Sequence, residues 1–216
     1  MTKKVVLITG TSKGIGKATA IVFAQEGYDV IGTYCHDEKG AEDLKKLGVT
    51  ILPLDVCDDQ SIKDLYGLIK KSHKKIDILI NNAGVSVVKP FVKQNTEEIE
   101  WQAMTNFLGL MRVTQVMLPL MKTGVIINIA SKLALKPAAK MAPYCASKFA
   151  VRGFTQSLAQ ELKEIRVYAV NPCTTATQMT HFKGVDPKKI AKVILKAAQE
   201  KLKKRPGDDV NVEDFF

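Results

Sequence analysis

The strongest constraint on the fold of this chain is its alternation of short β-branched runs with longer amphipathic stretches. The runs that indicate buried strands are Val5 to Thr9, Asp29 to Thr33, Ile51 to Leu54, Ile76 to Ile80, Val125 to Ile129 and Arg166 to Val170, with a short last strand at Val210 to Val212. Helical patterns lie between them, from about Ile15 to Gly27 and around Ser61 to Lys71, Thr96 to Met121 and Pro143 to Lys163. This alternation is typical of βαβ units. We therefore predict an α/β fold, a doubly wound parallel sheet in three αβα layers.

The length of the chain and its composition fit a single globular domain over residues 1–216. No linker, repeat or low-complexity segment interrupts the pattern, and 46% of the residues are apolar against 25% charged. The longest apolar stretches are far shorter than the ~20 residues that a membrane helix needs. The N-terminal sequence MTKK and the short run after it lack the apolar core of a signal peptide. We expect a cytoplasmic protein that does not insert into a membrane.

The formal net charge of +10 raises the question of a nucleic-acid partner. Nine basic and two acidic residues lie between Lys183 and Arg205. Apolar residues recur there at helical spacing, with lysines on the other side: Ile190, Val193, Ile194 and Ala197 against Lys189, Lys192 and Lys196. This indicates an amphipathic helix with a solvated lysine face. No aromatic interleaving or recognised motif accompanies the lysines, so nucleic-acid binding is the less favoured alternative.

The cysteines and histidines are too scattered to indicate a metal site. The cysteines, at 35, 57, 145 and 173, have no CxxC spacing and no histidine nearby with zinc-ligand spacing. We expect reduced, mostly buried thiols. The histidines, at 36, 73 and 181, each lie in a polar stretch, where a solvated surface position is expected. No metal is predicted.

A glycine-rich turn follows the first predicted strand and opens the first helix. Gly10, Gly14 and Gly16 lie in the sequence Thr-Gly-Thr-Ser-Lys-Gly-Ile-Gly from Thr9 to Gly16. Glycine allows the backbone to turn tightly and to approach a pyrophosphate, which then meets free N–H groups and the positive end of the helix dipole. The alternative is that the glycines serve only the turn. The strand before and the helix after favour dinucleotide binding.

The spacing of this turn, T-G-x-x-x-G-I-G, and the motifs that follow it form an ordered set. The later members are Asn81-Asn82-Ala83-Gly84, Asn106, Ser131, Tyr144-Cys-Ala-Ser-Lys148, Asn171-Pro172 and Thr177. With this set, which covers residues 4 to about 180, the chain resembles the short-chain dehydrogenase/reductase family. The resemblance implies a Rossmann-like fold and an oxidoreductase that interconverts a carbonyl and a secondary alcohol with NAD(P)(H). It also implies a homodimer or homotetramer formed through the helices around 96–121 and 143–163.

Two residues of the predicted helix at Pro143 to Lys163 point to acid–base chemistry. Tyr144 and Lys148 stand at i and i+4, so a helix places both on one face. A neighbouring ammonium favours the phenolate, so we expect Lys148 to lower the pKa of Tyr144 towards neutrality. Tyr144 then acts as general acid and base, and Ser131 hydrogen-bonds the reacting oxygen. The pair Tyr66 and Lys70 has the same spacing, but no serine-bearing strand end precedes it, and we interpret it as an ordinary helix surface.

The resemblance also assigns roles that the residues alone do not. It implies that Asn106 helps to hold a water that links Lys148 to solvent, and that Asp55 contacts the adenine. The implied cofactor-binding set is Gly10, Thr11, Ser12, Lys13, Gly14, Ile15, Gly16, Tyr34, Asp55, Val56, Asn82, Ala83, Gly84, Tyr144, Lys148, Pro172 and Thr177. One position departs from the family pattern, since Cys173 stands where a glycine usually follows the proline.

We expect NADP(H) rather than NAD(H). In the resembled family, NAD-selective members place an aspartate at the end of the second strand, and here that position is Tyr34, with Lys13 as a nearby cation. Asp37 keeps NAD(H) open, because a small shift of the strand end would bring its carboxylate to the ribose. Only nine residues, Gln178 to Asp186, separate Thr177 from Pro187, so we predict a short lid and an open, permissive pocket for a small-molecule substrate.

Three alternatives to a general carbonyl reductase stay open. The first is a 3-oxoacyl-carrier-protein reductase, because the segment from Asp29 to Asp43 resembles those enzymes and a basic face could dock an acidic carrier. The second is a non-catalytic nucleotide sensor, which we would expect to lack the tyrosine or the lysine. The third is the nucleic-acid-binding protein mentioned above, which a salt-dependent gel shift would detect.

Overall fold

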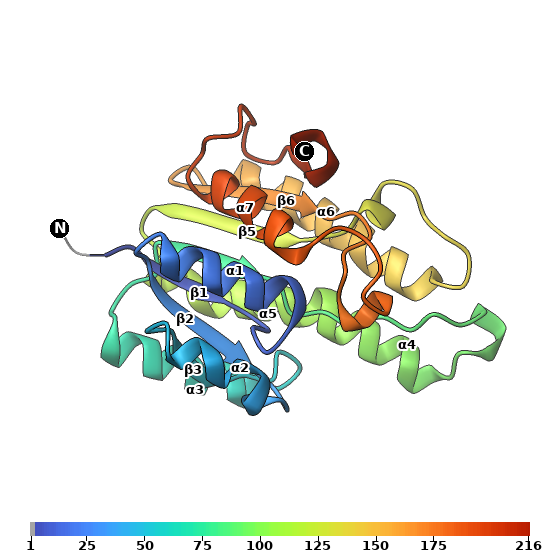
Figure 1. Ribbon diagram of the computed structural model, residues 1–216, viewed down its shortest axis with the longest axis horizontal. Helices are drawn as coiled ribbons and strands as arrows, with labels where there is room; N and C mark the ends of the chain where they lie inside the picture. Colours follow the sequence, from blue (N-terminus) through green and yellow to red (C-terminus); the bar gives the residue numbers. More distant parts are fainter. Residues whose placement is uncertain (1–2) are drawn as a thin grey trace.

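In the computed structural model, which describes residues 3–216, seven strands form one parallel sheet between two layers of helices (Figure 1). The strands are β1 (Val5–Ile8), β2 (Asp29–Tyr34), β3 (Thr50–Pro53), β4 (Ile78–Asn81), β5 (Gly124–Ile129), β6 (Ile165–Asn171) and β7 (Asp209–Asn211). Their order in the sheet is β3-β2-β1-β4-β5-β6-β7. The predicted fold class is confirmed. Met1 and Thr2 of the predicted N-terminal segment lie outside the described residues.

The strands of the sheet are buried because they pack against helices on both faces. Successive side chains of a strand point to opposite faces, and in β1 the side chains of Val6 and Ile8 join one apolar cluster while those of Val5 and Leu7 join another. The helices that pack in the first cluster are α1 (Gly14–Gln25), α2 (Glu38–Lys45) and α7 (Pro187–Ala198), and those in the second are α3 (Asp59–Ser72), α5 (Gly109–Met117) and α6 (Ala142–Glu161). Figure 1 shows α1 and α7 side by side. Ligands of such sheets bind beyond the carboxyl ends of the strands, where the strand order reverses between β1 and β4.

The helices begin and end where the chain supplies capping groups. Asp58 accepts a hydrogen bond from Gln60 N at the start of α3, and Asp186 caps α7 in the same way through Lys188 N. Gly27, with φ +82°, follows the end of α1 as predicted. Between Thr96 and Leu120 the chain forms α4 (Thr96–Ala103), a π-helical turn (Met104–Leu108), α5 and a 3₁₀ turn (Leu118–Leu120). The long predicted helix is therefore interrupted in its middle.

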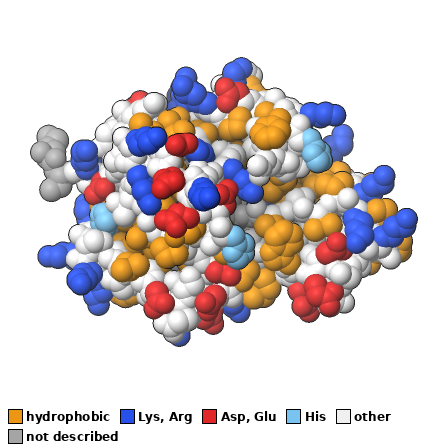
Figure 2. Space-filling model, turned by 60° about the horizontal axis from the view of Figure 1, so that its bottom comes forward, with side chains coloured by type: hydrophobic (Ala, Val, Ile, Leu, Met, Phe, Trp, Pro, Cys, Tyr) orange, Lys and Arg blue, Asp and Glu red, His pale blue; other side chains and the backbone are white. Residues whose placement is uncertain are grey.

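The C-terminal helix is held by an apolar face, and the last strand by a partly buried ion pair. The predicted apolar residues of α7 are buried and its lysines exposed. On the face shown in Figure 2, basic side chains are interspersed with acidic ones rather than gathered in one stripe. In β7, Asp209 accepts hydrogen bonds from Arg152 at 2.8 and 2.5 Å and from Asn171 at 2.9 Å. Burial alone would raise the pKa of Asp209, but the bonds from Arg152 and Asn171 hold it below its ordinary value.

The environments of the cysteines and of one histidine differ from the expectation. All four cysteines are free, but only Cys145 is buried, so the expectation of mostly buried thiols is wrong. Cys35 is exposed because it directly follows the carboxyl end of β2, where the chain leaves the sheet. His73 is partly buried at the end of α3, with Nε2 3.7 Å from Asp29 Oδ2, whereas the other two histidines are exposed.

Two features are absent from residues 3–216. In this part of the chain no helix is long and apolar enough to cross a membrane. The same residues contain no group of three or more His, Cys, Asp or Glu side chains that could hold a metal ion.

Candidate active site

The glycine-rich turn between β1 and α1 has a backbone conformation and a packing that require glycine. Gly10 and Gly14 have φ values of +73° and +59°, a region that other residues rarely adopt. A Cβ on Gly16 would lie 2.1 Å from Gly10 O and 2.4 Å from Asn82 Nδ2, so no side chain fits there. The turn is tied to β2 by Thr11 N, which donates to Thr33 O at 2.7 Å. Its fold therefore depends on glycine at these positions.

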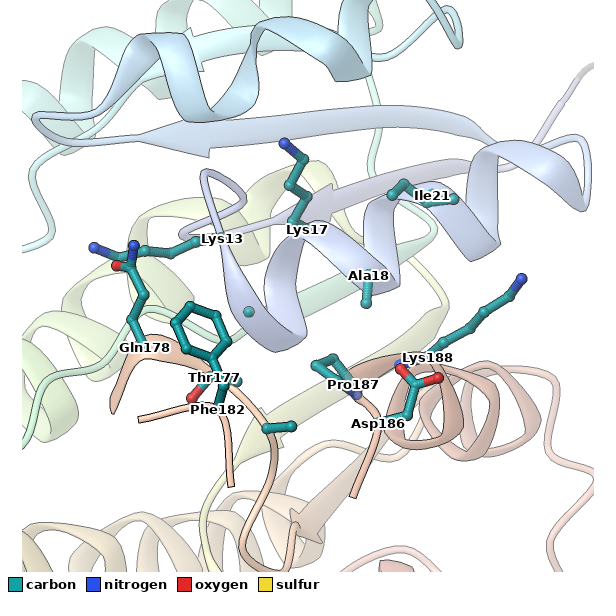
Figure 3. A pocket seen from close by; sticks show the side chains of 12 residues that line it. Lys13, Lys17, Ala18, Ile21, Thr177, Gln178, Phe182, Asp186, Pro187 and Lys188 are labelled. Carbon is teal, nitrogen blue, oxygen red and sulfur yellow. The ribbon is translucent and has the colours of Figure 1, made fainter. Parts of the chain in front are cut away.

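The first turn of α1 leaves its N–H groups available. Lys13 occupies the N-cap position, and no side chain caps the helix. Uncapped N–H groups at a helix start attract anions such as a pyrophosphate. A hollow of about 340 Å³ lies between this helix end and the segment from Ala176 to Lys188. Figure 3 shows the side chains of Lys13 and Gln178 reaching towards the same end of this hollow, with the Phe182 ring beside Thr177.

Asn82, after β4, positions the glycine turn from the neighbouring strand. Its Nδ2 donates to Thr9 O at 2.9 Å and to Gly10 O at 3.0 Å. Thr9 Oγ1 in turn accepts hydrogen bonds from the backbone N–H groups of Asn82 and Ala83. Thr9 is thus part of the site, although its side chain had no predicted role. The reciprocal bonds join the ends of β1 and β4, where the strand order reverses.

Ser131, Tyr144 and Lys148 come together at the carboxyl ends of β5 and the start of α6. Their exposed fractions are 8%, 8% and 4%. Ser131 lies near enough to the Tyr144 phenol to influence its pKa. Lys148 Nζ lies 5.8 Å from the centroid of the Tyr144 ring and donates to Ile129 O at 2.9 Å. The structure therefore brings together three polar groups that are separated in the sequence, in a largely buried position.

Burial controls the proton affinities of the tyrosine and lysine. It raises the pKa of Tyr144, with the nearby Ser131 side chain acting in the opposite direction. Burial lowers the pKa of Lys148 to about 8. The prediction that Lys148 lowers the pKa of Tyr144 towards neutrality is therefore not met in this structure, because removal of the phenolate from water outweighs the favourable contacts.

Asn106 lies in the π-helical turn and is completely buried. Its Oδ1 accepts a hydrogen bond from Val85 N at 2.7 Å, and its Nδ2 donates to Val85 O at 2.9 Å and to Ser147 Oγ at 3.0 Å. Ser147 Oγ also donates to Tyr144 O at 2.7 Å. Asn106 thus connects the loop after Gly84 to the helix that carries Tyr144. Ser147 was not predicted to take part, although it lies within the Tyr-Cys-Ala-Ser-Lys motif.

The last residue of β2, where the ribose of the adenosine is expected, is Tyr34 and not an aspartate. Partial burial and the nearby Glu38 raise the pKa of Tyr34. Asp37 caps α2, its Oδ1 accepting a hydrogen bond from Gly40 N at 2.8 Å. Asp55, after β3, accepts a hydrogen bond from Cys57 N through Oδ1 at 2.8 Å, and Val56 beside it is buried.

The segment after β6 forms a short, folded lid. Pro172 is buried and its O accepts a hydrogen bond from Lys132 N. Thr177 contacts the glycine turn, since a Cβ on Gly14 would lie 3.2 Å from its Cγ2. Gln178–Thr180 form a single 3₁₀ turn, as predicted, and Phe182 after it is 71% exposed.

Cys173 packs against one of the two main apolar clusters of the protein. Its side chain lies against the apolar cluster of α1 and α7, and burial and the nearby Glu213 raise the pKa of its thiol. The Cys173 side chain therefore lies close to the C-terminal segment that carries Glu213.

Several known proteins are similar to this chain in sequence. The model of a family described as short chain dehydrogenase matches residues 4–187. A 3-oxoacyl-acyl-carrier-protein reductase, FabG, of Thermotoga maritima is 37% identical over 188 residues, which cover 82% of this chain and 76% of the relative. An NADPH-dependent pterin aldehyde reductase of Arabidopsis thaliana is 34% identical, with coverage of 82% and 76%.

One solved structure, described as ribose-5-phosphate isomerase from Brucella melitensis, superimposes with a TM-score of 0.90 over 97% of this chain and 91% of that chain. At 24% identity, this likeness concerns the fold alone.

Proposed function

The chain belongs to the short-chain dehydrogenase family, and from this premise we propose that it interconverts a carbonyl and a secondary alcohol with a nicotinamide cofactor, using Tyr144 as general acid and base. As a member of this family it is an oxidoreductase that acts on CH–OH and C=O groups. The single observation that carries the proposal is the meeting of Ser131, Tyr144 and Lys148 near Gly84, at the end of the segment whose Asn82 bonds the glycine turn.

The residues of the site fit a dinucleotide. The turn has no room for a Cβ at Gly16, and the N–H groups at the start of α1 have no side-chain cap. Gly10 to Gly16 and Asn82 to Gly84 would hold the pyrophosphate and ribose side, with Thr11 and Ser12 in the turn, and Pro172 and Thr177 would lie at the nicotinamide end. When bound, the cofactor supplies or accepts a hydride at the substrate carbon.

The chain itself moves the proton. In reduction, the Tyr144 O–H bond breaks and its proton passes to the carbonyl oxygen, which becomes the alcohol oxygen. Ser131 donates a hydrogen bond to that oxygen as negative charge develops on it. Lys148, with its pKa of about 8, returns a proton to the phenolate at working pH. In oxidation of the alcohol, the same transfers run in reverse.

NADP(H) is the proposed cofactor. Tyr34 carries no negative charge to repel a 2′-phosphate, and the Asp37 carboxylate is engaged as the N-cap of α2. Lys13 is exposed at the mouth of the turn, where its ammonium can reach a phosphate.

We also propose that the protein forms a homo-oligomer and is found in the cytoplasm. Trp101 on α4 and Phe149 on α6 are apolar and exposed, which supports a homodimer or homotetramer formed through these helices. The four free cysteines fit the reducing cytoplasm.

A narrower function, the reduction of a 3-oxoacyl group on a carrier protein, is favoured by one observation. Exposed lysines lie on chain segments that adjoin the candidate site: Lys136 and Lys140 precede Tyr144 in the sequence, and Lys183 lies on the lid. An acidic carrier would meet complementary charge there. If this function holds, an acetoacetyl group on its carrier should have a lower and more salt-sensitive KM than the same group on a small thiol.

The test is a panel of aldehydes, ketones, quinones and acetoacetyl thioesters with NADPH and NADH, measured for wild type and Tyr144→Phe. The variant should lose about 10²- to 10⁴-fold in kcat while it still binds NADPH, because only the proton donor is removed. Tyr66→Phe is the matched control, since Tyr66 packs on α3 with Lys70 Nζ 5.7 Å from its ring. If Tyr144→Phe keeps about a tenth or more of the wild-type activity, Tyr144 is not the general acid.

A further inference from the structure

A buried amide lies on the helix that leads into the candidate site. Gln102 is 0% exposed. Its Oε1 accepts a hydrogen bond from Val87 N at 3.0 Å, and its Nε2 donates to Glu98 O at 2.9 Å and to Gln94 Oε1 at 3.1 Å. Burying an amide is unfavourable unless it is hydrogen-bonded, so an apolar residue would serve packing better. What the amide provides and an apolar side chain would not is the hydrogen bond from Val87 N in the loop.

Gln102 and Asn106 lie one helical turn apart and hold two points of the same loop. Asn106 binds both backbone groups of Val85, and Gln102 binds Val87. Three hydrogen bonds from the two amides thus hold the backbone of Val85 and Val87.

This loop forms a wall beside the catalytic side chains. It leaves Gly84, where a Cβ would lie 3.4 Å from Lys148 Nζ. It reaches Lys89, whose N donates to Lys140 O at 2.8 Å, four residues before Tyr144. The loop thus runs from a point near Lys148 on α6 to Lys140, in the segment that precedes α6.

The far end of the wall is also connected to Gln102. Gln94 Nε2 donates to Lys89 O at 2.9 Å, while Gln94 Oε1 accepts the bond from Gln102. Lys89 Nζ forms an ion pair with Glu98 at 2.9 Å. One side chain, Gln102, therefore restrains the middle of the loop directly and its end through Gln94.

We propose that Gln102 is a positioning residue for the substrate: by fixing the loop from Val85 to Lys89 it sets the wall against which the carbonyl compound lies. This inference rests on the function proposed above. Because the lid is a single 3₁₀ turn at Gln178–Thr180, the wall supplies a large share of the contacts that distinguish one substrate from another.

The test compares Gln102→Met with Gln60→Met. Methionine has a similar length but forms none of the amide bonds. Gln60 lies at the start of α3 and bonds Asp64 on the helix surface. For each variant, kcat and KM are measured with one compact and one bulky carbonyl, the NADPH Kd by fluorescence, and the backbone exchange of residues 85–89 by hydrogen–deuterium exchange.

Gln102→Met should raise KM and lower kcat/KM by about 10- to 100-fold, by different factors for the two carbonyls, with faster exchange of the loop and an unchanged NADPH Kd. Gln60→Met should match wild type. A residue that only stabilises the fold would reduce the active fraction and hence kcat, leaving both KM values and their ratio unchanged. That result would overturn the inference.

Gln94→Met provides a second test if Gln102→Met does not fold. It keeps the bond from Val87 N to Gln102 and removes the two bonds of the Gln94 amide, to Lys89 O and from Gln102 Nε2, so the KM shift should be smaller but still differ between the two carbonyls. Unchanged KM values in a folded Gln94→Met would then reject the role of the wall. A wild type inert towards every carbonyl would instead refute the proposed function, whereas an active wild type whose Gln102→Met variant keeps its KM values refutes this inference alone.

Discussion

The substitution Gly16→Ala tests the glycine turn with a magnitude that follows from the structure. The added Cβ would lie 2.1 Å from Gly10 O and 2.4 Å from Asn82 Nδ2, well inside the 3.0 Å below which real Cβ atoms essentially never approach. Gly10 O belongs to the backbone of the turn, so the turn itself must shift. Forcing an extra methyl group into a packed site costs about 1–3 kcal/mol, which corresponds to roughly 5- to 150-fold in a binding constant if it falls on the complex.

We expect Gly16→Ala to weaken NADPH binding by about tenfold or more and to lower the free energy of unfolding. The assays are a fluorescence titration with NADPH and a urea unfolding curve. Gly67→Ala is the control, because its Cβ meets no atom within 4 Å. Gly67 lies inside α3, where alanine is more favourable than glycine by about 0.5–1 kcal/mol, so this variant should gain stability and bind NADPH normally. A Gly16→Ala protein that binds NADPH within about threefold of wild type would refute the assignment of the turn.

Four further outcomes are expected. Lys13→Ala should weaken NADPH selectively, shown by the ratio of kcat/KM with the two cofactors; equal losses with NADH would place Lys13 on the shared pyrophosphate instead. In the carbonyl panel, the short lid should give several substrates with weak KM values, and one tightly bound substrate with a low-micromolar KM would contradict the open pocket. The rate of carbonyl reduction should fall as pH rises through about 8, where Lys148 loses its proton, and a flat pH–rate profile would exclude Lys148 from the proton path. Because the pKa of Asp209 is lower in the folded than in the unfolded state, its stabilisation is present above its unfolded pKa of about 3.9 and lost as pH falls through the folded value. Asp209→Asn should therefore show a smaller loss of stability on acidification in urea unfolding curves.

The strands could be predicted because their signal is local. Each of the first six predicted strands overlaps an observed one, and β5 differs by a single residue at its start. A run of β-branched residues between turn residues marks a buried strand without reference to the rest of the chain. The helix α2 was not predicted, since only Ala41 and Leu44 of its residues are buried and the others are mostly charged. Its stability depends on packing and on the Asp37 cap rather than on its own pattern.

The hydrogen-bond partners of the site could not be predicted, because they come from distant segments. Asn82 was identified from its motif, but its bonds to Thr9 and Gly10 span more than seventy residues. Gln102 has no motif at all. Its burial and its bond to Val87 exist only because α4 packs behind the loop, and a glutamine in a helical pattern otherwise indicates a solvated position.

The sequence by itself determined the alternating α/β architecture and the glycine turn, and it pointed to Ser131, Tyr144 and Lys148 as candidate site residues, because periodicity, turn chemistry and motif order are properties of the chain. The tertiary structure alone decided the proton affinities. The spacing of Tyr144 and Lys148 predicted a lowered tyrosine pKa, whereas burial raises it and lowers that of the lysine to about 8. The physical reason is that desolvation depends on every segment packed around a group, and neither a helix face nor a four-residue spacing contains that information.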